Sequence, residues 1–363
     1  MVVSSNFVHE MNANVLSLLQ HHPDAIRDTL VAIGQLYLAR LGRGSFVSAL
    51  SRRQRTLARL RTMENPLQNL ELSLCMLLQL TGLEIMDMKP SAGELGLSGL
   101  LSGAAMLVNR FFLQDRQASH IAKYFLRGLA RQDMIMALTH RRRPWIHTAL
   151  WLDEECLSSP DRFMGWTTTL MPLLEELCEL AEDTRLGVGW GRGNVGEDDD
   201  SWPTTRRHDY AIDLRLRIEN WQPIVTIKDS AAVTPTLLAQ ASALRLASLL
   251  YLHRILYSAG SSPARDQEAI DMGKEVLLTL GVVPEELRTM LWPTFVAACE
   301  MRQIEDRVLA LDVFDGIYTS RATATALAVK AFCVKRVWQA RDTGLDWDWM
   351  NLIYRYPGEC TPI

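Results

Sequence analysis

The segment from Pro235 to Tyr257 reads PTLLAQASALRLASLLYLHRILY and decides the fold class. Apolar side chains such as Leu237, Ala241 and Leu244 follow one another at intervals of three or four positions. This spacing gathers side chains on one face of an α-helix. The segment therefore predicts a long helix, the clearest helical pattern in the chain.

The same periodicity recurs along most of the sequence. Helices are predicted at Asp24–Leu41, Ser45–Met63, Pro66–Leu80, Leu95–Phe112, Ile121–Leu138, Ser159–Asp183, Pro263–Leu280, Pro284–Met301, Ile304–Ile317 and Ala322–Ala340. Strand patterns are nearly absent, and the short run Pro223–Ile227 is compatible with either a strand or a loop. The predicted fold class is all-α, a multi-helix domain whose antiparallel helices surround a shared core.

The segment from Gly187 to Arg207 departs from this pattern. It contains several glycines and the acidic run Glu197–Asp200, a composition that cannot bury a core. It predicts a long Gly/Asp-rich surface loop. Residues 1–363 then form a single large helical domain, or two halves, 1–186 and 208–363, joined by this flexible loop 187–207.

Composition limits the function classes. Hydrophobic residues make up 48% of the 363 positions, enough for a sizeable core, and the net charge is −4. A chain that neutralises phosphates by itself is usually basic, so this charge argues against unaided DNA binding. We expect an intracellular, soluble protein, nuclear or cytoplasmic, because neither a signal peptide nor a membrane-spanning stretch is evident.

Sequence motifs predict neither a metal site nor a cofactor. No two of the six cysteines are separated by only two residues, as a zinc cluster or finger requires, so reduced core cysteines are expected. The run Gly191–Gly196 matches the dinucleotide fingerprint by letter, but acids follow it where a pyrophosphate needs positive potential.

Charged residues yield no catalytic assignment, because such sites assemble in space. The arginines from Arg52 to Arg61 predict a solvated helix face, and the cluster Arg141–Arg143 predicts a helix C-terminus. Five acids in apolar stretches are candidates for proton transfer, although each is expected to face solvent or pair with an arginine: Glu71, Glu84, Asp133, Glu300 and Asp312. Local pairs are expected for Asp133 with Arg131 and for Glu300 with Arg302. Catalytic residues are therefore unknown.

The C-terminal region carries the most specific pattern. Trp292 and Pro293 open an apolar helix, and Trp338, Arg341–Asp342 and Asp346–Trp347 follow. This order resembles the end of the large regulatory domain of fungal zinc-cluster transcription factors.

Earlier segments extend the resemblance. Pro23–Ile33 is similar to the opening helix of the family, and Asp133–Leu138 with Arg142–Pro144 is similar to a second conserved element. Leu101–Ala104 resembles a third, although Leu100 stands where the family has a histidine.

The resemblance implies an all-helical regulatory domain that receives small-molecule or protein signals, often dimerises and lies beside a zinc-cluster DNA reader. We therefore expect a regulator without a DNA-binding module, which acts by effector and protein binding, as a homodimer or with a zinc-cluster partner. The alternatives are a stand-alone cofactor-free enzyme of fungal secondary metabolism (a cyclase, isomerase or hydro-lyase) and a purely structural partner.

Overall fold

The regular structure is helical, which confirms the predicted fold class. The computed structural model describes residues 7–40, 42–87, 93–158, 160, 162–187, 202–225, 234–282 and 287–363, and no β-strand occurs in these ranges. The α-helices are α1 (Val8–His21), α2 (Pro23–Arg40), α3 (Phe46–Arg61), α4 (Leu70–Asp87), α5 (Gly93–Phe112), α6 (His120–Thr139), α7 (Glu154–Ser158), α8 (Met171–Leu186), α9 (Trp202–Asn220), α10 (Thr234–Leu256), α11 (Pro263–Gly281), α12 (Leu291–Glu300), α13 (Ile304–Ser320), α14 (Ala324–Phe332), α15 (Gln339–Asp342) and α16 (Trp349–Arg355). Two 3₁₀ turns, η2 (Thr148–Leu150) and η3 (Thr168–Leu170), and a π-helical stretch, η4 (Cys333–Trp338), complete the order.

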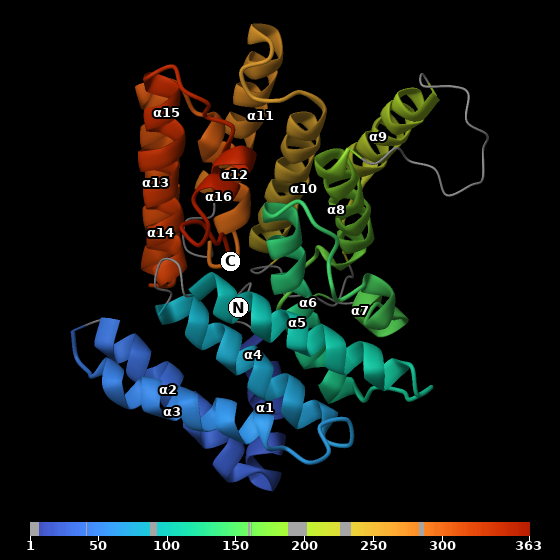
Figure 1. The fold of residues 1–363 in the computed structure, drawn as a ribbon, viewed down its shortest axis with the longest axis vertical. Helices are drawn as coiled ribbons and strands as arrows, with labels where there is room; N and C mark the ends of the chain where they lie inside the picture. Colours follow the sequence, from blue (N-terminus) through green and yellow to red (C-terminus); the bar gives the residue numbers. More distant parts are fainter. Residues whose placement is uncertain are drawn as a thin grey trace.

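The helices form two packed groups that meet at the middle of the molecule. Figure 1 shows α2, α3 and α4 at one end and α11, α13 and α15 at the other. In the first group α2 packs on α3 and α4, and α4 packs on α5 and α6. In the second group α10 packs on α11 and α12, and α6 reaches α8 between the groups. Neighbours in sequence are mostly neighbours in space, as short connections require.

Two helices form the centre of the core. All ten residues of α12 are buried, and α6 is buried along most of its length. Ile26, Leu129 and Phe295 belong to one large cluster of buried apolar side chains, which draws on helices before and after the segment 187–207. The division into halves stays a prediction. Because α12 is fully buried, the carbonyl groups at its C-terminal end must find donors within the protein.

Several predicted boundaries were wrong. The helix expected from Ser159 begins instead at Met171, with a proline in its first turn, and the one expected from Pro284 begins at Leu291. The helix expected from Pro66 begins at Leu70. The predicted helix Ala322–Ala340 contains the π-helical η4. A proline is tolerated in a first helical turn, but it does not require a helix to follow.

The predicted loop 187–207 was wrong over its last six residues. Trp202–Arg207, assigned to the loop from the sequence, form the start of α9, and residues 188–201 lie outside the described residues. The helices α1, α7 and α16 were not predicted either. Of the candidate strand, residues 223–225 have no regular structure, and residues 226–227 lie outside the described ranges.

Candidate functional site

The C-terminal sequence pattern converges on the end of α12. Trp338 Nε1 donates to the carbonyl of Ala298 at 2.8 Å, and Arg341 Nη1 donates to the carbonyl of Glu300 at 2.6 Å. Arg307 Nε donates to the carbonyl of the next residue at 3.3 Å. The last carbonyls of a helix lack intrahelical donors, so these three side chains cap a helix end that water cannot reach.

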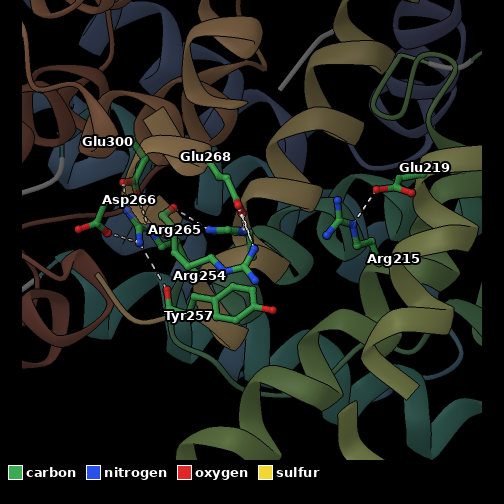
Figure 2. Close-up of polar contacts among 9 residues, drawn as sticks. Arg215, Glu219, Arg254, Tyr257, Arg265, Asp266, Glu268 and Glu300 are labelled. Carbon is green, nitrogen blue, oxygen red and sulfur yellow. Dashed lines mark hydrogen bonds and ion pairs between the residues drawn. The ribbon is translucent and has the colours of Figure 1, made fainter. Parts of the chain in front are cut away.

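A buried ion pair lies at the same helix end. Glu300 is fully buried and Arg254 is 4% exposed. Arg254 Nε and Nη2 donate to the two carboxylate oxygens at 3.0 and 2.5 Å, and its Nη1 donates to Asp266 at 2.7 Å (Figure 2). Burial would lower the pKa of Arg254, but the hydrogen bonds and charges of Glu300 and Asp266 hold it above its usual value. Both carboxylate oxygens of Glu300 therefore accept a charge-assisted hydrogen bond, as a buried ion pair requires.

Trp347 closes the cluster from the other side. Its ring lies 3.8 Å from the guanidinium carbon of Arg341 and 5.3 Å from that of Arg254. Asp342 accepts from Arg307 at 2.6 and 2.7 Å, and this arginine in turn lies over the Trp338 ring. Four residues of the C-terminal pattern therefore gather at the end of α12: Trp338, Arg341, Asp342 and Trp347. We refer to these four residues with Arg254, Glu300 and Arg307 as the α12 clamp.

His253 lies beside the α12 clamp on α10. Its Nε2 is 2.9 Å from the carbonyl of Arg265, and its ring packs on Tyr257 at 5.1 Å. Arg265 pairs with Glu268 at 2.8 Å, while Arg215 and Glu219 form a separate pair on α9 (Figure 2). Burial lowers the pKa of His253, and the charge of Arg254 adds to this effect. The imidazole is therefore held neutral at physiological pH.

Among the other candidate acids, Asp133, Glu84 and Asp312 confirm the expectation that each pairs with an arginine or faces solvent, whereas Glu71 is half-buried beside a serine. Asp133, fully buried, accepts from Arg142 at 2.6 Å and from the amides of Trp145 and Ile146 at 2.5 and 2.8 Å. Asp312 is exposed. The local partners were wrong: Arg142 replaces Arg131 as the ion-pair partner of Asp133.

Glu84 and Glu71 also have partners. Glu84 pairs with Arg53, although burial raises the pKa of its carboxyl more than that pairing lowers it. Glu71 accepts from Ser119, the N-cap of α6. For Glu300, likewise, the partner is Arg254 and not the predicted Arg302.

The basic clusters bind acids of the same chain. Arg52 and Arg55 contact the Asp28 carboxylate at 2.7 and 2.9 Å, and Arg59 lies 3.9 Å from it. The hydrogen bond from Arg55 is the largest of the effects that lower the pKa of Asp28. The prediction of a simply solvated helix face was therefore incomplete, because these arginines join α3 to α2.

The second basic cluster follows the C-terminus of α6, as predicted. Arg142 binds Asp133, Arg143 lies 3.1 Å from Glu182, and Arg141 lies over the ring of Tyr354. Each guanidinium therefore has a partner within the fold, an arrangement that leaves little of this charge for a nucleic acid.

A cavity of about 230 Å³ opens where α1, α4, α5 and α6 meet. Its lining includes Glu71, Phe111, Arg116 and Ser119. Arg116 donates to the carbonyl of Leu67 at 3.0 Å and lies over the Phe111 ring. The polar groups named here are thus already bonded within the protein, and the volume is below the roughly 300–1,000 Å³ of most small-molecule pockets.

Cysteines do not form a metal centre in the described ranges. All six are buried and free, as expected of core thiols, and burial raises the pKa of Cys156 to about 11. Within the same ranges, no three His, Cys, Asp or Glu side chains form a group suited to a metal ion. Likewise, none of the described helices has the length and hydropathy needed to cross a membrane.

Comparison with known families identifies the family of the chain. The model of the fungal-specific transcription factor domain matches residues 4–356. The chain belongs to this family. No curated protein and no solved structure matches it. In this fungal-specific transcription factor domain, four residues of the C-terminal sequence pattern belong to the α12 clamp at the end of one helix: Trp338, Arg341, Asp342 and Trp347.

Proposed function

We propose that this fungal-specific transcription factor domain is a transcription regulator that acts by binding a small-molecule effector and other proteins. Family membership over residues 4–356 is the observation that carries the proposal. The mechanism is a shift in population between alternative helix packings when the effector binds. We further propose that the chain does not contact DNA directly and that its partner is a second copy of itself or a zinc-cluster protein.

The state of the buried acids favours a regulator over an enzyme. A cofactor-free cyclase, isomerase or hydro-lyase needs an acid or base that can reach the substrate. The three buried candidates, Glu84, Asp133 and Glu300, are each bound to an arginine of the same chain. Their role in the fold is therefore accounted for without chemistry on a substrate.

Deletion of the gene in its native host tests the proposal, with transcripts and metabolites profiled together. If the protein is a regulator, the deletion strain loses the transcripts of a defined gene set, and reintroduction of the chain restores them. Reintroduction of an Asp312→Asn variant serves as a matched control, because this side chain is exposed on α13. Persistence of all transcripts with accumulation of one unprocessed intermediate would overturn the regulator and identify an enzyme.

Binding to DNA and to other proteins is tested separately. The purified chain should not retard promoter fragments from the responsive genes, and cross-linking in cell extract should recover a second copy or a zinc-cluster protein. Retardation by the chain alone would contradict the proposed mode of action.

A further inference from the structure

The cavity where α1, α4, α5 and α6 meet has two side chains of opposite charge in its wall. Glu71 comes from the first turn of α4, and Arg116 comes from the loop between α5 and α6. Leu18 and the C-cap residue His22 of α1 line another part of the wall. These parts of the chain meet because α4 packs on α1, α5 and α6 (Figure 1). The fold therefore presents a cation and an anion to the same small space.

Two side-chain hydrogen bonds tie the loop between α5 and α6 to the start of α4. Arg116 Nη1 donates to the carbonyl of Leu67 at 3.0 Å, and its guanidinium carbon lies 4.7 Å from the centre of the Phe111 ring. Ser119 Oγ, three residues later in the same loop, donates to Glu71 Oε1. Both charged side chains are thus held in position before a ligand binds, which lowers the entropic cost of binding.

Both charged groups keep most of their hydrogen-bonding capacity. A guanidinium has five N–H donors and a carboxylate has two oxygen atoms, and the contacts above use one donor of Arg116 and one oxygen of Glu71. Neither group forms an ion pair, with the other or with any further residue that the structure describes. A ligand that carries both signs of charge can therefore bind them without displacing a bond of the protein.

The size of the cavity restricts the ligand to a small molecule. Its volume is about 230 Å³. A water molecule takes about 30 Å³ in the liquid, so this space holds roughly eight non-hydrogen atoms. The rim is open to solvent, since the lining residues Gln68, Gln117 and Ser119 are exposed. A free amino acid of the size of valine or serine can therefore enter and fit.

We propose that this cavity binds a small zwitterion, a molecule of amino-acid size with one carboxylate and one ammonium group. Arg116 binds the carboxylate through its unused N–H donors, and Glu71 binds the ammonium group. A simple anion would meet the repulsion of Glu71, and a simple cation that of Arg116, so the wall selects a ligand with both charges.

This inference names the chemical class of the effector and therefore rests on the proposed function. The ligand bridges the start of α4 and the loop that precedes α6. Its binding accordingly favours the helix packing in which these two segments lie together.

Isothermal titration calorimetry of the full chain tests the site with two probes, L-valine and L-serine. We expect saturable binding of at least one probe at one site per chain. Each probe is compared with its analogue without the amino group, isovalerate or 3-hydroxypropionate, and with its analogue without the carboxylate, isobutylamine or ethanolamine. Loss of a charge-assisted hydrogen bond weakens binding roughly tenfold or more, so both analogues should have a Kd higher by at least that factor.

Two variants locate the site. Glu71→Gln keeps an oxygen that can accept from Ser119 but removes the charge, and Arg116→Gln removes the guanidinium. Each should raise the Kd of the active probe roughly tenfold or more, with folding checked by circular dichroism. Glu64→Gln and Arg110→Gln are matched controls, because both residues are exposed and neither lines the cavity, and they should leave the Kd unchanged.

The analogues separate direct contact from a merely structural effect. In Glu71→Gln, the amino acid and its analogue without the amino group should bind about equally, because the partner of the ammonium group is gone. A structural effect would instead weaken both compounds by the same factor. This comparison and the wild-type analogue series decide the question even if Arg116→Gln does not fold.

Three results overturn the proposal: no saturable binding of either probe, wild-type binding of a single-charge analogue as tight as that of the amino acid, or an unchanged Kd in both cavity variants. These results leave the regulator to be judged by transcript profiles. Conversely, amino-acid binding by a chain whose deletion changes no transcript retains the site and removes the regulatory role.

Discussion

Substitution of Glu300 by Gln is expected to destabilise the protein strongly through the α12 clamp. The carboxylate is fully buried and receives both Nε and Nη2 of Arg254, whose side chain is itself buried. The amide keeps the size of the side chain but removes its charge. Removal of one partner from a buried ion pair costs about 3–5 kcal/mol, because the remaining charge stays away from water.

The expected loss lies at the lower end of that range. Asp266 still binds Arg254 at 2.7 Å, and the Trp347 ring still faces it at 5.3 Å, so its charge is not left without partners. The backbone carbonyl of residue 300 also still accepts from Arg341. We therefore expect a loss of about 3 kcal/mol in the free energy of unfolding, which corresponds to a Tm lower by about 4 °C for 363 residues.

Urea unfolding followed by circular dichroism measures this loss, with Asp312→Asn on α13 as an exposed matched control. The double variant Arg254→Met with Glu300→Met separates pairing from packing, because replacement of both partners by apolar groups is often nearly neutral. We expect the double variant to be more stable than either single variant. A Glu300→Gln protein within about 0.5 kcal/mol of the wild type would refute the reasoning.

Three further predictions concern packing, pH and thiol chemistry. Gly273→Ala places a Cβ 2.8 Å from Met301 Cε and 3.1 Å from the Ala297 carbonyl oxygen. Urea unfolding should therefore show a decrease of about 1–3 kcal/mol in the free energy of unfolding. In Gly103→Ala the new Cβ meets nothing within 4 Å, so the free energy of unfolding should instead increase by about 0.5–1 kcal/mol. The pKa of His253 in the folded protein lies below its unfolded value of 6.5. Its contribution to stability is therefore complete above pH 6.5 and is lost as the pH falls towards the folded pKa. His253→Gln should flatten the plot of stability against pH below 6.5, and an unchanged slope there would contradict the lowered pKa. Burial of all six thiols, with the Cys156 pKa raised to about 11, predicts that a thiol reagent labels none quickly at pH 8 and all six in guanidinium chloride; rapid native labelling would show that a thiol is accessible.

Local patterns predicted the helices whose apolar stripe is unbroken. The segment Pro235–Tyr257 became α10 with each end shifted by one residue, and Ile304–Ile317 became α13, which ends three residues later than predicted. Proline was a less reliable guide to a helix start, since Pro263 begins α11 whereas α12 begins at Leu291 rather than Pro284. Proline fixes one backbone angle, whereas the start of a helix also depends on which residues the core can bury.

The π-helical stretch could not be predicted from periodicity. Between Phe332 and Gln339 the chain continues in a helical direction but with wider turns. Each residue inserted into an α-helix rotates the remainder of that helix by about 100°. Trp338 comes at the end of this stretch, and its Nε1 reaches the carbonyl of Ala298. A pattern based on 3.6 residues per turn cannot indicate this change of direction, because the change depends on the contacts that the side chain makes.

The ion-pair partners of the buried acids could not be predicted from the sequence either, because they too depend on tertiary contacts. The sequence suggested neighbours for the buried acids, but Asp133 binds Arg142 after the chain has turned back, and Glu300 binds Arg254 from another helix. A buried carboxylate takes the guanidinium that the tertiary fold brings into the same dry environment, whatever their separation in sequence. The sequence could identify arginines as candidate partners. Which arginine pairs with Glu300 depends on the packing of α10 against α12.

Several residues of the C-terminal sequence pattern share one structural task. Trp338 and Arg341 donate to carbonyls at the end of α12, and Trp347 packs on Arg341. A helix end buried this deeply tolerates few alternatives, since each uncapped carbonyl lacks water as a substitute partner. These residues therefore determine how α12 ends in this chain.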